Sequence, residues 1–269
     1  MKVLVLMGSP RKKGNTYEAV RKIEERMKTL GDIEFEYLFL RDVHLEPCVG
    51  CFQCLSWGEE RCPLKDDRDE IEKKILSSDG VIFATPVYAF NVTALMKNFL
   101  DRFAYTLHRP RFFNQKAMII CTTGALGLKE TIDRMAVAQF AGYNLVHSAG
   151  FTTPYSKISL KAKKKIDNDI AEAAEKFYKA LISREPIKPK LINLIGFKAQ
   201  QTAFGLTHQY GHGDADYRYF KDRGWLDKGR QYYVDARINP VKALIARLVG
   251  WYFRRNLVKD LEEGVLWSS

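Results

Sequence analysis

Cysteines are the residues of this chain whose type and spacing most clearly indicate chemistry. Four of the five lie close together in the sequence, at Cys48, Cys51, Cys54 and Cys62. Thiolates are typical ligands of iron–sulfur clusters and of zinc. Because structural zinc sites usually contain two separated pairs of ligands, three evenly spaced cysteines followed by a fourth favour a [4Fe–4S] cluster. Zinc, a redox-active pair of thiols and a loop without a cofactor are the alternatives.

A polar loop at residues 8–16 is the second chemical feature. It follows an apolar run at residues 3–7 and precedes a segment with helical spacing at residues 17–30. Side-chain donors, positive charge and the backbone N–H groups at the start of that helix could together bind a phosphate. The candidates are Ser9, Arg11, Gly14, Asn15 and Thr16. The loop matches neither a P-loop nor the G-x-G-x-x-G pattern, and an ordinary polar turn is the alternative.

Two further loops have the composition of a site for a flat ring. Residues 85–91 offer a stiff proline, apolar surface and an aromatic face, through Pro86, Val87, Tyr88 and Asn91. Small residues let the backbone approach the edge of a ring closely, and the later loop provides them as Thr122, Thr123 and Gly124. The preceding Cys121 ends an apolar run, so we expect a buried, unreactive thiol. For each loop alone, ordinary turn chemistry is the alternative.

The segments between these loops alternate between apolar runs and amphipathic stretches. Strands are predicted at residues 3–7, 33–40, 80–84, 117–121 and 145–149, and helices at residues 17–30, 66–77, 91–107, 128–142 and 161–182. This alternation predicts an α/β fold, a doubly wound five-stranded parallel sheet with helices on both faces. Ligands of such folds bind beyond the carboxyl ends of the strands, which is where the three polar loops are expected.

The chain is expected to comprise one domain and an extension. Residues 1–184 would form the α/β domain, with the cysteines in a long loop at residues 41–66, and residues 185–269 a basic, aromatic-rich C-terminal extension. A helix is predicted at residues 240–255, with apolar residues at 241, 244, 245, 248, 249 and 252. A membrane-surface helix is one interpretation. We expect instead that the stripe packs on the chain's own body or on a second copy.

The polar loop resembles the G-S-x-R-x-x-[GS]-[NF]-[ST] loop of the NADPH-dependent FMN reductase superfamily, a flavodoxin-like group. Residues 95–103 (LMKNFLDRF) are similar to the Q-L-K-x-F-x-D-R helix of that group, with departures at Met96 and Asn98. Because ion pairs on helix faces are common, we expect Asp101 and Arg102 at the helix surface or in an interface, with catalysis as the alternative. The resemblance implies that FMN is the cofactor. It further implies that the FMN phosphate is held by Ser9, Arg11, Asn15 and Thr16, and that residues 122–124 contact the pyrimidine end of the flavin.

Within this superfamily, the cysteine spacing and the acidic segment 65–71 (KDDRDEI) resemble the iron–sulfur flavoproteins of anaerobic archaea and bacteria. The resemblance implies a [4Fe–4S] cluster on the four clustered cysteines, close to FMN, and an FMN-dependent oxidoreductase that passes electrons between the two. NAD(P)H or a ferredoxin-like protein would be the redox partner and a small molecule the acceptor, and the chain would form homo-oligomers. The alternatives are a cluster-free NAD(P)H-dependent FMN or quinone reductase and a non-catalytic flavin electron carrier. No side chain is identified as catalytic.

Charge and motif composition limit the kinds of binding partner that we expect. The formal net charge is +11 over 269 residues, which by itself fits anionic ligands, nucleic acid or an anionic membrane surface. The sequence has neither zinc-finger spacing nor an aromatic RNA-binding motif, so we expect no nucleic acid partner. No apolar run approaches the roughly 18 residues that a membrane span needs. The short N-terminal run is typical of a first strand and not of a signal peptide, so we expect a cytoplasmic protein.

Overall fold

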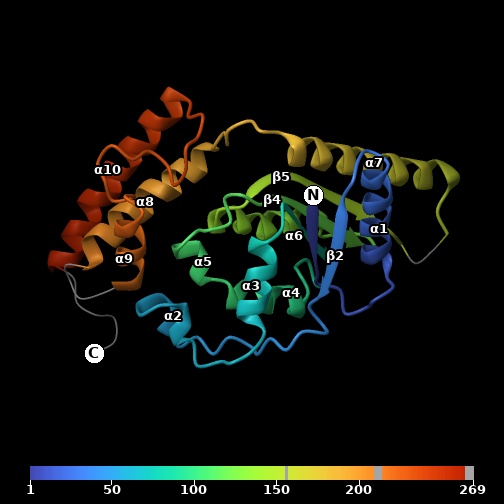
Figure 1. The fold of residues 1–269 in the computed structure, drawn as a ribbon, viewed down its shortest axis with the longest axis horizontal. Coiled ribbons are helices and arrows are strands. Elements are labelled where there is room, and N and C mark those ends of the chain that lie inside the picture. Colours follow the sequence, from blue (N-terminus) through green and yellow to red (C-terminus); the bar gives the residue numbers. More distant parts are fainter. Residues whose placement is uncertain (155–156, 209–213, 264–269) are drawn as a thin grey trace. The chain divides into compact units, whose positions relative to one another are not determined.

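The computed structural model describes residues 1–154, 157–208 and 214–263, and the chain divides into two compact units. The first unit comprises Met1–Val49 and Leu64–Arg184, and the second comprises Gly50–Pro63 and Glu185–Ser269. Residues 50–63, which include three of the clustered cysteines, therefore belong to the same unit as the C-terminal third. The elements of both units are labelled in Figure 1. Each unit is described by itself.

The first unit is built on a five-stranded sheet in the order β2-β1-β3-β4-β5. The strands are β1 (Lys2–Met7), β2 (Glu34–Phe39), β3 (Gly80–Pro86), β4 (Lys116–Thr123) and β5 (Asn144–Thr152). Every neighbouring pair is parallel, which confirms the predicted α/β fold. The central strands β1, β3 and β4 are continuous apolar runs because both of their faces are buried. The edge strand β2 is half-exposed.

Helices cover both faces of this sheet. They are α1 (Asn15–Lys28), α3 (Arg68–Leu76), α4 (Ala94–Arg102), α5 (Tyr105–His108), α6 (Leu128–Met135) and α7 (Leu160–Ile182). Apolar side chains of α1 and α7, including Ile23 and Phe177, pack with β1, β3 and β4 in one core cluster. On the other face, Phe99 of α4 lies 6.2 Å from Phe83 between ring centroids. The helices predicted at residues 91–107 and 128–142 are each interrupted, the second by a 3₁₀ turn at Ala136–Ala141.

The second unit is helical. It contains α2 (Gln53–Ser56), a 3₁₀ turn at Glu59–Arg61, α8 (Leu191–Thr207), α9 (Asp214–Asp222) and α10 (Pro240–Glu263). Aromatic rings form its interior, where Trp225 lies 5.1 Å from Phe220 and 4.9 Å from Tyr233 between centroids. The predicted C-terminal helix is confirmed and extends to Glu263. None of the helices in the described residues combines the length and apolar character that a transmembrane segment requires.

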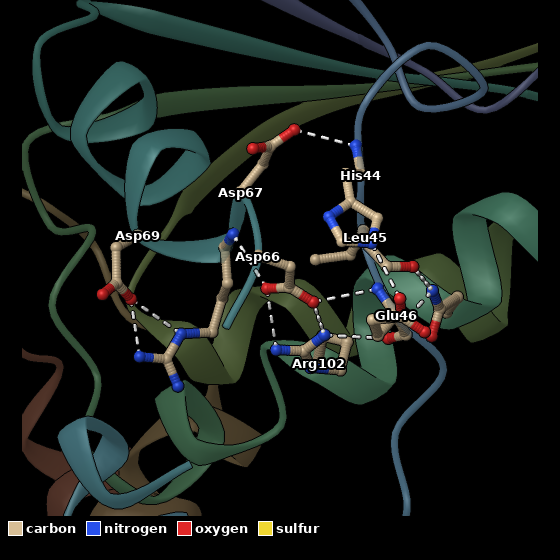
Figure 2. A network of polar contacts seen from close by, with 9 residues as sticks. His44, Leu45, Glu46, Asp66, Asp67, Asp69 and Arg102 are labelled. Carbon is tan, nitrogen blue, oxygen red and sulfur yellow. Dashed lines mark hydrogen bonds and ion pairs between the residues drawn. The ribbon is translucent and has the colours of Figure 1, made fainter. Parts of the chain in front are cut away.

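Two adjacent aspartates, which follow the cysteine-bearing segment, hydrogen-bond to the backbone that precedes it, within the first unit (Figure 2). Asp66 Oδ2 accepts the backbone N–H of Glu46 at 2.9 Å, and Asp67 Oδ2 accepts the backbone N–H of His44 at 2.8 Å. The backbone N–H of Asp67 returns a bond to the carbonyl oxygen of His44 at 2.9 Å. Residues 44–46 and 66–67 are therefore held side by side, so the ends of the intervening segment are fixed.

Arg102 of α4 completes this network from inside the first unit. It forms an ion pair with Asp66, whose Oδ1 also lies 3.0 Å from Arg102 Nη2, and Arg102 Nη1 donates to the carbonyl oxygen of Glu46 at 2.8 Å. From the sequence we expected Arg102 at the helix surface or in an interface. It instead lies inside the first unit, where the side chains of Arg102 and Asp66 are buried almost completely. Its neighbour Asp101 does lie on the surface, paired with Lys97.

Burial and hydrogen bonding act in opposite directions on Asp66. Burial alone raises its pKa, whereas hydrogen bonds from Arg102 and from the backbone N–H groups of Glu46 and Arg68 lower it, and the net pKa lies below the usual value. The charged carboxylate therefore stabilises the fold above the pKa of an unfolded aspartate, about 3.9. This stabilisation is lost as the pH falls through the lower pKa of the folded state.

We expect the Asp66→Asn substitution to lower the free energy of unfolding by about 3 kcal/mol, because removing one partner leaves a buried, uncompensated charge on Arg102. Urea unfolding of the full chain at neutral pH measures the loss. Asp101→Asn is the matched control, since it removes a carboxylate from an exposed pair with Lys97 on the same helix and should cost about 0.5 kcal/mol. Equal losses in the two variants would contradict the role given to Asp66.

Candidate functional site

One cavity of about 390 Å³ lies at the carboxyl edge of the sheet in the first unit. Because all five strands are parallel, the loops that follow β1, β3, β4 and β5 reach this edge together. The lining residues are Ser9, Arg11, Lys13, Gly14, Asn15, Thr16, Pro86, Val87, Tyr88, Thr122, Thr123, Gly124, Thr153 and Pro154. Every residue proposed from the sequence for cofactor binding lines this cavity except Asn91. Four loops far apart in the sequence thus contribute to one site.

The amino end of α1 gives one side of the cavity a positive character. The helix begins at Asn15, and Gly14 before it has an extended backbone with no side-chain hydrogen bond capping the first turn. Unpaired N–H groups at a helix start attract anions. Ser9 is buried beside them, and its Oγ accepts the backbone N–H of Arg11 at 3.1 Å, so its own proton remains able to donate. Arg11 and Lys13 add positive charge to the lining.

Side chains of the first turn of α1 also join the loops to one another. Asn15 Nδ2 donates to Thr153 Oγ1 at 2.9 Å and to the Thr153 carbonyl oxygen at 3.2 Å. The hydroxyls of Thr16 and Thr122 are hydrogen-bonded at 2.6 Å, and both residues are buried. The backbone N–H of Thr153 donates to the carbonyl oxygen of Thr123 at 2.7 Å. These bonds hold the carboxyl ends of β4 and β5 against the start of α1, so the cavity is largely preformed.

The loop after β3 forms a different wall. Its backbone is tied to β4 where the N–H of Val87 donates to the Thr122 carbonyl oxygen at 2.8 Å. Tyr88 then pairs with Asn91 through two backbone hydrogen bonds of 2.9 Å, across a tight turn in which Ala89 and Phe90 have positive φ angles. The ring of Tyr88 is 47% exposed, which leaves a flat aromatic face beside the cavity.

Asn91 is the predicted residue that the structure does not bring into this cavity. Its Oδ1 accepts the backbone N–H of Val92 at 2.9 Å, so its side chain stabilises its own turn. Asn91 instead lines a separate apolar cavity of about 370 Å³ beside α4 and α5. Spacing along the loop could not reveal this, because the tight turn at residues 88–91 reverses the chain.

Sequence reasoning missed three residues of the lining. Lys13 lies inside the polar loop, and Thr153 and Pro154 follow β5. The rule that ligands lie beyond the carboxyl ends of parallel strands applies to β5 as well as to the other strands. That rule was the available signal for residues 153–154, and they were missed because the strand was expected to end at residue 149 and not at Thr152.

The clustered cysteines are divided between the two units. Cys48 belongs to the first, and Cys51, Cys54 and Cys62 belong to the second. Cys48 and Cys51 are exposed, whereas Cys54 and Cys62 are half-buried. Within the described residues, no three His, Cys, Asp or Glu side chains are grouped so that they could hold a metal ion.

An edge cavity of this kind, above a parallel five-stranded sheet, defines a flavodoxin-like α/β protein with a ligand site at the ends of its strands. The profile of the family described as NADPH-dependent FMN reductase matches residues 1–152. The chain therefore belongs to the NADPH-dependent FMN reductase family, and the protein is a flavin-dependent oxidoreductase. The resemblance seen in the sequence is confirmed.

Individual proteins show similarity over most of the chain. An iron-sulfur flavoprotein of Archaeoglobus fulgidus is 30% identical over 233 residues, which cover 84% of this chain and 100% of the relative. An iron-sulfur flavoprotein of Clostridioides difficile (strain 630) is 29% identical over 218 residues, covering 78% and 94%. The crystal structure of an azoreductase from Bacillus anthracis str. Sterne has a TM-score of 0.52 and 15% identity, covering 66% of this chain and 99% of that one. At this identity, the last similarity supports the fold alone.

Cys121 differs from the clustered cysteines in environment, and this predicts a difference in reactivity. It is buried in β4, and burial raises the pKa of its thiol to about 12. In metal-free protein at pH 8, iodoacetamide should modify the exposed Cys48 and Cys51 at least about a thousandfold faster than Cys121, because only the thiolate reacts. Peptide mass spectrometry over time measures the rates, with modification of all five in urea as the control. Modification of Cys121 at the rate of Cys51 in the native state would contradict this.

Proposed function

We propose that the cavity at the carboxyl edge of the first unit binds FMN, with the phosphate at the start of α1 and the flavin ring between the loops after β3 and β4. The observation that supports this most strongly is the convergence of the predicted residues, since Ser9, Tyr88 and Thr122 come from three separate loops and line one cavity. When bound, FMN supplies the redox chemistry, whereas the chain supplies position and electrostatics.

The phosphate would be held chiefly by the loop after β1. The uncapped first turn of α1 offers backbone N–H groups, and the buried hydroxyl of Ser9 can donate a further hydrogen bond. Arg11 would add a charge-assisted bond, which is stronger than one between neutral groups. In this proposal Asn15 and Thr16 contribute through their backbone and by keeping the loops together, because their side chains already bond Thr153 and Thr122.

The flavin ring would lie against the apolar surface of Pro86, Val87 and the ring of Tyr88. Thr122, Thr123 and Gly124 also line the cavity, where small side chains leave backbone groups accessible to the polar edge of a ring. Thr123 Oγ1 already donates to the carbonyl oxygen of Leu126 at 2.6 Å, so the backbone of this loop is held in place. The chain would therefore orient the ring by shape and by backbone hydrogen bonds.

The Arg11→Gln substitution should raise the dissociation constant for FMN about tenfold, because it removes a charge-assisted hydrogen bond to a phosphate. Quenching of flavin fluorescence during titration of the flavin-free chain measures the constant. Lys12→Gln is the matched control, since Lys12 lies in the same loop but outside the cavity, where it pairs with Asp42 at 2.7 Å. That variant should change the constant by less than about twofold. Equal effects would place the phosphate elsewhere.

We further propose that Cys48, Cys51, Cys54 and Cys62 bind a [4Fe–4S] cluster and that the protein transfers electrons between this cluster and FMN. The donor set supports this, because four thiolates with three at short, even spacing suit a cubane cluster. Two relatives named iron-sulfur flavoprotein match most of the chain. NAD(P)H or a ferredoxin-like protein would supply electrons, a small molecule would accept them, and the protein would act in the cytoplasm as a homo-oligomer.

A cluster-free NAD(P)H-dependent FMN or quinone reductase is the second candidate. It is supported by the match of residues 1–152 to the family described as NADPH-dependent FMN reductase. In this case the cysteine-bearing segment would have no metal, and NAD(P)H would reduce the flavin in the edge cavity directly. The two candidates share the FMN site and differ in iron content.

Anaerobically purified protein should contain about four irons and four acid-labile sulfides per chain if the cluster is present. Cys51→Ser should lower both to a small fraction of that content, since it removes one thiolate ligand. Cys121→Ser is the matched control, because this thiol is buried in β4 and should leave iron and sulfide unchanged. A flavin spectrum without iron in the unmodified protein would reject the cluster and favour the second candidate.

A further inference from the structure

The last helix packs on its neighbour through small residues. Within the second unit, α10 lies beside α8 (Figure 1). Ala246 is 1% exposed, and a Cβ added at Gly250 would lie 3.1 Å from the Cβ of Lys198 on α8. Ala246 and Gly250 are one helical turn apart and therefore lie on the same face of α10. This close approach uses the side of the helix that carries small side chains.

Bulky apolar side chains occupy the remaining surface of the first half of α10. The exposed residues are Val241, Leu244, Ile245, Leu248, Val249, Trp251, Tyr252 and Phe253. Leu248 and Trp251 are 59% and 60% exposed. Within the second unit this stripe does not pack on α8, since its residues are exposed and the contact with α8 is made by small ones. A contiguous exposed apolar surface of this kind typically marks a binding surface.

The segment that carries this apolar surface is also positively charged. Residues 240–255 contain four basic residues and no acidic one, and residues 186–269 contain fourteen Lys and Arg against eight Asp and Glu. A cavity of about 240 Å³ between α8 and α10 is lined by Lys198, Lys228 and Arg247, and its described lining includes no carboxylate. Burial and the charge of Arg247 lower the pKa of Lys198, which indicates that positive charge accumulates there without full compensation.

These features discriminate between two occupants of the surface. Helix α10 carries five basic residues and three acidic ones, and the acidic ones lie in its last turn. A second copy would therefore bring two helices of like net charge together across a self-complementary contact, which opposes the association. A bilayer with anionic lipids offers both acyl chains and negative phosphates. The exposed surface of residues 240–255 combines bulky apolar side chains, including Trp and Tyr, with interspersed Lys and Arg and no acidic residue, a composition that suits a membrane interface.

We propose that α10 binds the surface of an anionic lipid bilayer, with Leu248, Trp251 and Tyr252 inserted below the headgroups and with Lys242, Arg247, Arg254 and Arg255 contacting lipid phosphates. The helix lies in the plane of the interface and does not cross the membrane, because its second half is rich in charged residues. This attachment is independent of which redox partner the flavin site uses.

Flotation of the full, FMN-loaded chain with vesicles tests the proposal. Vesicles of phosphatidylcholine with about one third phosphatidylserine should carry the protein, and those of phosphatidylcholine alone should bind at least about tenfold less, because anionic headgroups attract the basic residues. Raising the salt to about 1 M should weaken the binding to anionic vesicles by screening. Equal binding to both vesicle types, or binding to neither, would overturn the proposal.

Variants locate the binding surface. The double substitution Leu248→Gln and Trp251→Gln should lower the partition coefficient for anionic vesicles about tenfold or more, because it removes inserted apolar area. Ile192→Gln, at an exposed apolar residue of α8 in the same unit, is the matched control and should leave binding unchanged. Gel filtration without lipid tests the other occupant. An oligomer that the double substitution dissociates, together with no loss of vesicle binding, would assign the surface to a second copy and overturn the proposal.

Discussion

The parallel arrangement of the strands is the constraint on which the site depends, because it brings four loops to one edge of the sheet. Hydrogen bonds between those loops then determine the shape of the cavity. Thr16 bonds Thr122 and Asn15 bonds Thr153, so the first turn of α1 is joined to the ends of β4 and β5. The helix whose positive end would bind a phosphate is thereby fixed relative to the loops that would hold the flavin ring.

A second constraint acts where the cysteine-bearing segment joins the first unit. Asp66 and Arg102 form a buried ion pair. Asp66 also accepts the backbone N–H of Glu46, and Arg102 donates to the carbonyl oxygen of Glu46. Buried charges are tolerated only when they are paired and hydrogen-bonded, and this pair meets both conditions. The acidic segment at residues 65–71, which resembles that of iron–sulfur flavoproteins, therefore has a structural role independent of any cluster.

Much of the first unit was predictable because its signals are local. Apolar runs predicted all five strands, and loop composition identified most of the cavity lining. The failures have physical causes. Arg102 is buried only because Asp66 reaches it from another segment, and Asn91 leaves the cavity because a tight turn reverses the chain. Helix α8 lacks a clear amphipathic stripe in the sequence, and the stripe of α10 is exposed, so periodicity alone could not assign the surfaces of the second unit.

Binding of the FMN phosphate at the start of α1, as proposed, can be tested by comparing FMN with riboflavin. The two ligands have the same ring and differ only in the phosphate. Titration of the flavin-free chain with each should give a dissociation constant for FMN at least about a hundredfold lower, since several charge-assisted hydrogen bonds depend on the phosphate. Equal affinities for FMN and riboflavin would show that this loop does not bind a phosphate and would contradict the account.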